Sequence, residues 1–315
     1  MRSPTGGSVL RTKRPDQPGR DGRRSPKGPP PSRRAQPSPR GKPPTAPPRG
    51  KKPTGPIATG PPPIGIVPGH ELLYGRNAVA EALQGRRQPR RLFIAEGVKE
   101  DERLRAIIRH AAEIELDIDR PPRMMLDDVT RGANHQGVAL EASEYEYLDF
   151  DEAIHAPGTV LVLDHLQDPQ NFGTLLRAAE AAGVAGVIIP QDRAVAVTPA
   201  VVNASAGAVE HLAVALVPNL ARGLDTLKRA GWWIVGLDSG PGSVDLYRTD
   251  VPTPVALVVG AEGSGIGQNV RGRCDILVSL PLRGQVASLN AATAGAIALF
   301  ELLRREDTTA SALGE

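Results

Sequence analysis

The stretch from Val255 to Asn290, VALVVGAEGSGIGQNVRGRCDILVSLPLRGQVASLN, decides the fold of this chain. It holds two short apolar runs, Val255–Val259 and Ile276–Leu280, and each run ends in a loop rich in glycine or proline. Apolar runs of this length between such loops are typical of strands buried in a parallel sheet. Because ligands bind beyond the carboxyl ends of such strands, the stretch predicts a ligand crevice in an open α/β sheet.

Four polar residues stand inside or just after these loops: Glu262, Arg283, Ser288 and Asn290. Glycines there let the backbone approach a ligand closely, and loops on a rigid scaffold are where sites are found. Two ordinary strand–helix turns are the alternative that glycine alone supports. In that alternative Ser288 is simply the N-cap of the Ala-rich helix that follows. The polar residues favour a functional site.

Upstream of this stretch, apolar runs alternate with helical patterns. We expect further strands at 159–163, 184–189, 212–217 and 232–237, and helices at 174–182, 199–205, 220–230, 267–273 and 289–305. This alternation predicts a mostly parallel sheet with helices on both faces. Between the first strand and its helix lies a loop, DHLQDPQNFG. In it Asn171 is the expected N-cap, and Asp164 and Asp168 are expected to stabilise the turn.

Composition divides the chain into five parts. We expect a disordered Pro/Arg-rich tail at residues 1–68, a small α/β domain at 69–144, a linker at 145–157, the sheet domain at 158–306 and a flexible end at 307–315. In the small domain, residues 101–115 have one apolar face and predict a helix. The tetrapeptide Asn134-His135-Gln136-Gly137 predicts a polar turn before the last strand of that domain.

The first 68 residues differ from the rest in charge. They hold 19 of the 31 prolines and a net charge of +13, so the remaining chain carries −10. A segment without apolar periodicity cannot bury enough surface to fold. Its Arg/Lys and Pro/Gly mixture indicates an arm that attracts nucleic acid, and a solubility tail without a specific partner is the alternative. It lacks the apolar core of a secretory signal and is too proline-rich for an amphipathic transit helix.

Several classes of protein are excluded or disfavoured. The single cysteine, Cys274, permits no disulfide within the chain, which fits a cytoplasmic location, and it precedes an apolar strand as a core residue would. No apolar run is long enough to span a membrane, and the scattered histidines predict no metal site. A phosphate-binding Walker loop and a Gly-x-Ser-x-Gly nucleophile elbow are missing. Glu262–Gly267 does not fit the dinucleotide fingerprint.

Three segments together resemble the SpoU/TrmH family of RNA ribose 2′-O-methyltransferases. They are DHLQDPQNFGTLLR at 164–177, LVVGAEGSGI at 257–266 and LPLRGQVASLNAATA at 280–294. Residues 203–212, NASAGAVEHL, match a further family segment, although Asn203 stands where a basic residue is frequent. Residues 74–79 and the turn at 134–137 resemble the opening and the closing turn of the family's RNA-binding domain. The resemblance covers residues 69–305.

The resemblance implies a SPOUT-type catalytic domain, in which a parallel sheet carries a deep trefoil knot. It also implies S-adenosylmethionine as cofactor, held by backbone at Gly260, Leu280 and Leu289, and a homodimer formed through the catalytic domain. The implied catalytic residues are Asn171, Arg177, Glu262, Ser288 and Asn290. Arg177 is the candidate that helps the 2′-hydroxyl lose its proton, either as base or as hydrogen-bond donor, although arginine is normally protonated.

The two-domain form most resembles the guanosine methyltransferases of large-subunit ribosomal RNA. Transfer RNA is the alternative substrate, and antibiotic resistance through ribosomal RNA methylation or a non-catalytic role in ribosome assembly are alternative functions. Because the chain after residue 68 is acidic, RNA binding by it requires local basic patches. The candidates on the small domain are Arg76, Arg86, Arg87, Arg90 and Arg91; a solvated surface loop is the alternative explanation for this arginine cluster.

Overall fold

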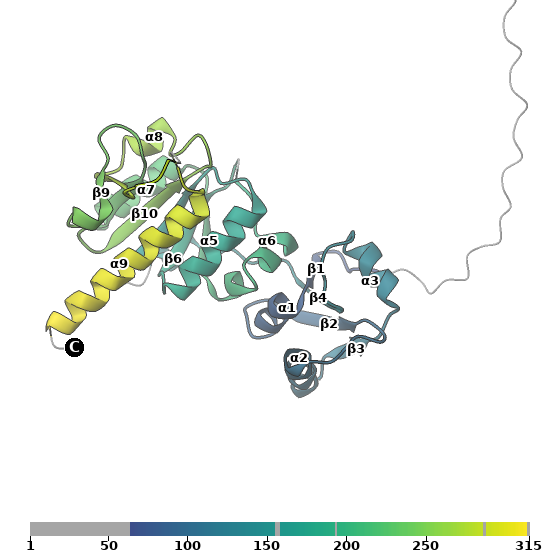
Figure 1. The fold of residues 1–315 in the computed structure, drawn as a ribbon. Helices are drawn as coiled ribbons and strands as arrows, with labels where there is room; N and C mark the ends of the chain where they lie inside the picture. Colours follow the sequence, from purple (N-terminus) through teal and green to yellow (C-terminus); the bar gives the residue numbers. More distant parts are fainter. Residues whose placement is uncertain (1–63, 155–157, 193, 286–287, 314–315) are drawn as a thin grey trace, which may run out of the picture. The chain divides into compact units, whose positions relative to one another are not determined.

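The computed structural model describes residues 64–154, 158–192, 194–285 and 288–313, which form two β-sheets with their helices (Figure 1). The first sheet comprises β1 (His70–Tyr74), β2 (Pro89–Ile94), β3 (Asp117–Asp119) and β4 (Val138–Ser143), with α1 (Arg76–Ala82), α2 (Glu102–Glu113) and α3 (Arg123–Val129). The disorder expected of the basic tail concerns residues 1–63, which lie outside the described residues.

The small domain has strand order β1-β4-β2-β3, with β4 antiparallel to both neighbours and β3 parallel to β2. β1 and α3 were not predicted from the sequence, because HELLY alternates too weakly and residues 123–129 carry three charges. Residues just before β1 also belong to the domain. Val67 donates its N–H to Glu141, at 2.9 Å, and the carbonyl of Gly65 accepts from Arg91. The boundary expected at residue 68 is therefore a few residues too late.

The second sheet contains seven strands. They are β5 (Thr159–Asp164), β6 (Gly186–Pro190), β7 (Val214–Val217), β8 (Trp233–Leu237), β9 (Val244–Asp245), β10 (Val255–Gly260) and β11 (Ile276–Ser279). Their order is β7-β6-β5-β10-β8-β11-β9, and every neighbouring pair is parallel. The helices are α4 (Phe150–Ala153), α5 (Pro169–Ala181), α6 (Pro199–Ala204), α7 (Leu220–Arg229), α8 (Gln268–Arg271) and α9 (Ala291–Leu313), with 3-10 turns η1 (Ala208–His211) and η2 (Leu246–Arg248). The expected α/β fold with a parallel sheet is confirmed.

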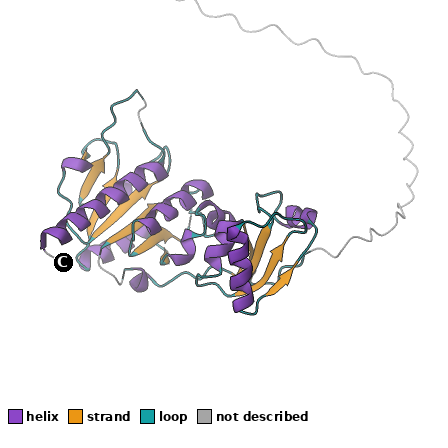
Figure 2. Ribbon diagram, turned by 60° about the horizontal axis from the view of Figure 1, so that its bottom comes forward, coloured by secondary structure: helices purple, strands orange, loops and turns teal. Residues whose placement is uncertain are grey.

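Helices cover both faces of this sheet (Figure 2). Alternate residues of the central strands point to opposite sides, so Leu161 and Leu257 pack toward α5 and α9, whereas Val160 and Val258 pack toward α7 and α8. Every position of β5 and β10 is buried. Because both faces of these strands are covered, their sequences are nearly continuous apolar runs. α9 lies along α5 on one face (Figure 1).

The strand order turns back between β5 and β10. β6 and β7 extend the sheet on one side of β5, and the later strands extend it on the other. The carboxyl ends at such a reversal leave room for a ligand. β11 lies between β8 and β9, two strands that precede it in the chain. The trefoil knot expected in this region stays a prediction.

Two helices differ from their expected bounds by more than two residues. α5 begins at Pro169, five residues early, because Asp168 caps it and proline suits its first turn. α9 continues to Leu313 instead of ending at Arg305, and the flexibility expected of residues 307–315 stays a prediction. Within the described ranges, α9 included, no helix has the length and apolar character needed to cross a membrane.

Candidate active site

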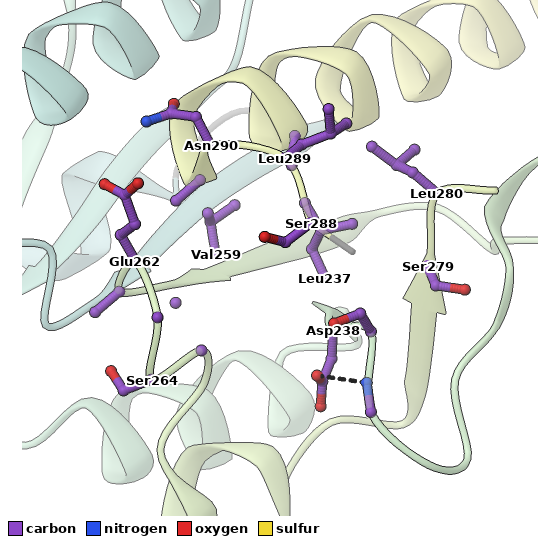
Figure 3. Close-up of a pocket in the computed structure, with 18 of the residues that line it drawn as sticks. Leu237, Asp238, Val259, Glu262, Ser264, Ser279, Leu280, Ser288, Leu289 and Asn290 are labelled. Carbon is purple, nitrogen blue, oxygen red and sulfur yellow. Dashed lines mark hydrogen bonds between the residues drawn. The ribbon is translucent and has the colours of Figure 1, made fainter. Parts of the chain in front are cut away.

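A cavity of about 670 Å³ opens at the carboxyl ends of β8, β10 and β11 (Figure 3). Residues 237–240, 259–265, 279–280, 282, 288–291 and 294 line it. The volume lies in the range of roughly 300–1,000 Å³ found for small-molecule sites. Leucine and valine side chains, glycine backbone and serine hydroxyls face one another across it, which suits a ligand with both apolar and polar parts.

The glycine-rich turn after β10 forms one lip of the cavity. A side chain at Gly260 would place its Cβ 2.2 Å from the carbonyl carbon of Gly265, so only glycine fits there. Ala261 and Gly265 exchange two backbone hydrogen bonds, at 3.2 and 2.9 Å. The buried carboxylate of Asp164 accepts a hydrogen bond from the N–H of Gly267, at 2.7 Å, and another from His165. These contacts hold the turn in one conformation and confirm Asp164 as a loop-stabilising residue.

A chain of hydrogen bonds joins three of the candidate catalytic side chains. Asn171 donates through Nδ2 to Oε2 of Glu262, at 2.9 Å, and accepts through Oδ1 from Nδ2 of Asn290, at 2.8 Å. These residues come from α5, the turn after β10 and the start of α9, which lie far apart in the sequence. Glu262 and Asn290 also line the cavity, so the cluster stands at its rim (Figure 3).

Helix capping explains why the Asn171 side chain is free for this contact. Asp168 caps α5 by accepting from the N–H of Asn171, and Asn290 caps α9 by accepting from Ala292 and Thr293. Asn171 is therefore not the N-cap of α5, and the alternative explanation of Ser288 as the N-cap of α9 does not hold. Ser288 lines the cavity instead.

Arg177 lies apart from the cluster. It is exposed, it does not line the cavity, and it makes no hydrogen bond or ion pair in the described part of the chain. Six residues separate it from Asn171, which is about 9 Å along a helix axis. Arg283 is exposed in the loop after β11 and does not line the cavity either. The structure thus brings together Asn171, Glu262, Ser288 and Asn290, and leaves Arg177 outside.

The three backbone positions expected to hold the cofactor, Gly260, Leu280 and Leu289, all line the cavity. The wall that follows β8, formed by residues 237–240, was not predicted from the sequence. The signal for it was present, since the apolar run at 232–237 is followed by Asp-Ser-Gly-Pro-Gly. The rule that ligands bind beyond the carboxyl ends of parallel strands applies to β8 as it does to β10.

Most of the arginines expected to bind RNA have other partners. Arg76 pairs with Asp101, and Arg90 and Arg91 pair with the buried Glu141. Arg87 is a clear correction: its side chain is 1% exposed and is held by Glu71 and Glu210. Among the five only Arg86 is exposed without a hydrogen bond or ion pair in the described ranges. The close spacing of these arginines in sequence accompanies structural ion pairs, and RNA binding by the arginines other than Arg87 stays a prediction.

The remaining candidate groups are structural in this fold. Burial raises the pKa of the Cys274 thiol to about 12, and its sulfur contacts the carbonyl of Val270, as expected of a packed cysteine. His135 accepts from the N–H of Gly137 and donates to Asp127, which fixes the turn expected at 134–137. In the described ranges, histidine, cysteine and acidic side chains do not gather into a group able to hold a metal ion.

Comparison with known proteins identifies the family. Residues 158–300 match the model of the SpoU rRNA Methylase family, and residues 72–148 match that of RNA 2′-O ribose methyltransferase substrate binding. YacO of Bacillus subtilis, which is assigned to the TrmH family of tRNA/rRNA methyltransferases, is 38% identical over 244 residues, or 76% of this chain and 97% of YacO. The chain belongs to the SpoU/TrmH family of RNA methyltransferases.

Two further similar proteins agree with this assignment. The uncharacterized tRNA/rRNA methyltransferase slr0955 of Synechocystis is 38% identical over 255 residues, which cover 78% of this chain and 66% of that protein. The crystal structure of the SpoU methyltransferase AviRb from Streptomyces viridochromogenes matches with a TM-score of 0.64 and 25% identity, over 76% of this chain and 91% of AviRb. AviRb has also been crystallised with AdoMet.

Proposed function

We propose that this protein transfers a methyl group from S-adenosylmethionine to a ribose 2′-hydroxyl of RNA, at a guanosine of large-subunit ribosomal RNA. The observation that carries the proposal is the Asn171–Glu262–Asn290 cluster at the rim of a glycine-lined cavity. Family membership supplies the reaction class, and the cluster is built of the side chains that the family resemblance assigns to catalysis. An RNA substrate of this kind also implies a cytoplasmic enzyme.

The cavity fits S-adenosylmethionine. Leu237, Val259, Leu280 and Leu289 offer apolar surface for a purine, while backbone at Gly260 and the serine hydroxyls offer polar partners. When bound, the cofactor supplies the methyl group that the 2′-oxygen attacks. Gly260, Leu280 and Leu289 would hold it through their backbone groups, as the family resemblance implies.

The polar cluster would orient the ribose beside the cofactor. The Glu262 carboxylate has one hydrogen bond to a neutral amide in the described structure, so it keeps acceptor capacity for a substrate hydroxyl. The Asn171 amide fixes Glu262 and Asn290 relative to one another, and such positioning contributes strongly to rate. Arg177, exposed on α5, would approach the substrate from the RNA side, where its charge meets the backbone or the 2′-oxygen.

The protein would also form a homodimer. A homodimer through the catalytic domain would cover exposed apolar side chains such as Phe300 on α9, which is 47% exposed. Light scattering of the full chain should give twice the monomer mass.

Arg86 on the small domain and the basic tail would add electrostatic attraction to RNA.

The test is a ribose-methylation map of ribosomal and transfer RNA from cells with and without this gene. Loss of one guanosine in large-subunit ribosomal RNA is the expected result. A lost site in transfer RNA would replace the proposed substrate, and the absence of any lost site would contradict the proposed reaction.

Substitutions in the Asn171–Glu262–Asn290 cluster test whether this cluster carries out the methylation. Asn171→Ala should reduce kcat/KM by about 100-fold because the cluster loses the residue that holds it together. The matched control is Asn269→Ala, an exposed asparagine on α8 whose partner is Arg273. It should methylate at the wild-type rate. Similar losses in both variants would remove the cluster from the mechanism.

A further inference from the structure

Two ionisable side chains line the cavity in the described part of the chain, Glu262 and Asp238, and they lie on opposite sides of it (Figure 3). Glu262 belongs to the cluster that would orient the ribose. Asp238 follows directly after β8, next to Ser239 and Gly240, and has no part in the proposed chemistry. A partly buried carboxylate in a ligand cavity needs hydrogen-bond or ionic partners, and those partners indicate its role.

Asp238 holds the loop that forms the β8 wall of the cavity. Its Oδ1 accepts from the N–H of Gly240, at 2.9 Å, and its Oδ2 accepts from Nε of Arg271, at 2.6 Å. Arg271 also donates through Nη2 to the carbonyl of Pro241, at 2.7 Å. The loop from 238 to 241 is thus fixed by three hydrogen bonds, two of which need the guanidinium. Arg271 also keeps the pKa of Asp238 below its usual value although burial opposes this.

Arg271 belongs to a different segment, which does not itself line the cavity. It is the last residue of α8, which begins at Gln268 immediately after the glycine-rich turn. The ion pair therefore ties the loop after β8 to the segment that follows the turn after β10. Because β8 and β10 are neighbours in the sheet, this tie joins the segments that follow two adjacent strands.

We infer that the Asp238–Arg271 pair is a positioning device for the methyl donor: it holds residues 238–240 where the cofactor must contact them. Asp238 is a positioning residue, because it acts through the loop. This inference rests on the proposed function, since the ligand of the cavity is taken to be S-adenosylmethionine.

The chain contains a matched control two residues away. Arg273 pairs with Asp225 of α7, at 3.2 Å, and also bonds to Asn269. The two arginines are similarly exposed, at 34% for Arg271 and 31% for Arg273. Neither Arg273 nor Asp225 lines the cavity. Both arginines tie the end of α8 to another element, and only Arg271 ties it to a cavity wall.

The experiment is calorimetric titration of the full-length protein with S-adenosylmethionine and with S-adenosylhomocysteine. Arg271→Gln should raise both dissociation constants about tenfold, the effect of one lost charge-assisted hydrogen bond. Arg273→Gln should leave both constants unchanged. Asp238→Asn keeps an acceptor for Gly240 and loses the ionic contact, so its constants should fall between these two. In methylation assays, KM for the donor should rise more in Arg271→Gln than kcat falls.

Thermal unfolding without ligand separates positioning from general stability. Equal melting temperatures for Arg271→Gln and Arg273→Gln, with different affinities, support the inference. Wild-type affinity in Arg271→Gln, or equal losses of affinity in both variants, would overturn it. If the wild-type protein binds neither S-adenosylmethionine nor S-adenosylhomocysteine, the proposed function itself fails. The wild-type titration therefore distinguishes this failure from a failure of the inference.

Discussion

Glu301 lies on α9 with its side chain 9% exposed, where two arginines from the following turn bind its carboxylate. Nε of Arg304 donates to it at 2.8 Å and Nε of Arg305 at 2.7 Å. The hydrogen bonds and charges of Arg304 and Arg305 lower the pKa of Glu301 from 4.5 to about 2 against the opposing effect of burial. The folded protein therefore stabilises the ionised form of Glu301.

This shift predicts a pH dependence of stability. Since the pKa is lower in the folded state, the Glu301 carboxylate stabilises the fold fully above about pH 4.5 and loses this contribution as the pH falls toward 2. Urea unfolding of the wild type and of Glu301→Gln at several pH values tests it. The wild type should be more stable near neutral pH, and the difference should shrink below pH 4.5. A difference that stays constant down to the acid limit would contradict the assignment.

At the scale of elements, the end of β10 depends on one glycine. The Cβ of an alanine at Gly260 would meet Gly265 at 2.2 Å and the nitrogen of Ile266 at 2.4 Å, both backbone atoms that cannot move aside cheaply. Gly260→Ala should therefore lower the free energy of unfolding by about 1–3 kcal/mol, the usual effect of overpacking, and abolish cofactor binding.

Gly272 provides the control for this substitution. It ends α8 with φ −65, and an added Cβ would meet its nearest neighbour, the carbonyl of Gln268, at 3.4 Å. Gly272→Ala should bind S-adenosylmethionine normally and unfold at the same or a slightly higher denaturant concentration. Denaturant titration and calorimetry measure both effects. Normal binding in Gly260→Ala would show that the turn is not the cofactor lip.

At the scale of the whole molecule, Arg87 joins the small domain to the catalytic domain. Its guanidinium binds Glu71 at 2.5 Å and Glu210 at 3.0 Å, and it lies over the ring of Tyr145. The side chains of Arg87 and Glu210 are 1% and 0% exposed. Arg87→Met would leave the Glu210 carboxylate buried without its cation, so unfolding free energy should fall by about 3–5 kcal/mol.

Arg103→Met is the matched control, because the Arg103–Glu81 pair is 47% and 30% exposed. Exposed pairs contribute about 0–1 kcal/mol, so this variant should resemble the wild type in denaturant unfolding. Equal stabilities for Arg87→Met and Arg103→Met would show that the buried pair does not hold the domains together.

The basic tail is predicted to act on RNA binding and not on folding. Because Gly65 and Val67 contact the small domain, the test deletion removes residues 1–63 only. The shortened protein should unfold at the same denaturant concentration, bind RNA more weakly and show a smaller slope of log affinity against log salt. Identical salt slopes with and without these residues would contradict the role of the tail.

Local sequence determined the sheet domain. Strands buried on both faces must be apolar throughout, so β5, β6 and β10 were visible as runs, and the glycines and polar residues after β10 marked the carboxyl edge where a ligand fits. Capping was visible too, since Asp168-Pro169 is a helix start, although Asn171 was taken for the cap. These features depend on neighbouring residues along the chain.

Only the tertiary structure decided which side chains meet. Asn171 and Glu262 are 91 residues apart, and the parallel pairing of β5 with β10 brings them within 2.9 Å. The same holds for Arg87, whose partner Glu210 lies 123 residues away and turns an apparent surface arginine into a buried one. The sequence by itself determined the family, the strands of the catalytic domain that are buried on both faces, and the edge of the sheet that carries the site. Burial and ion pairing depend on distant residues, so the β8 wall, the Asp238–Arg271 pair and the structural role of the arginines became visible only in the fold.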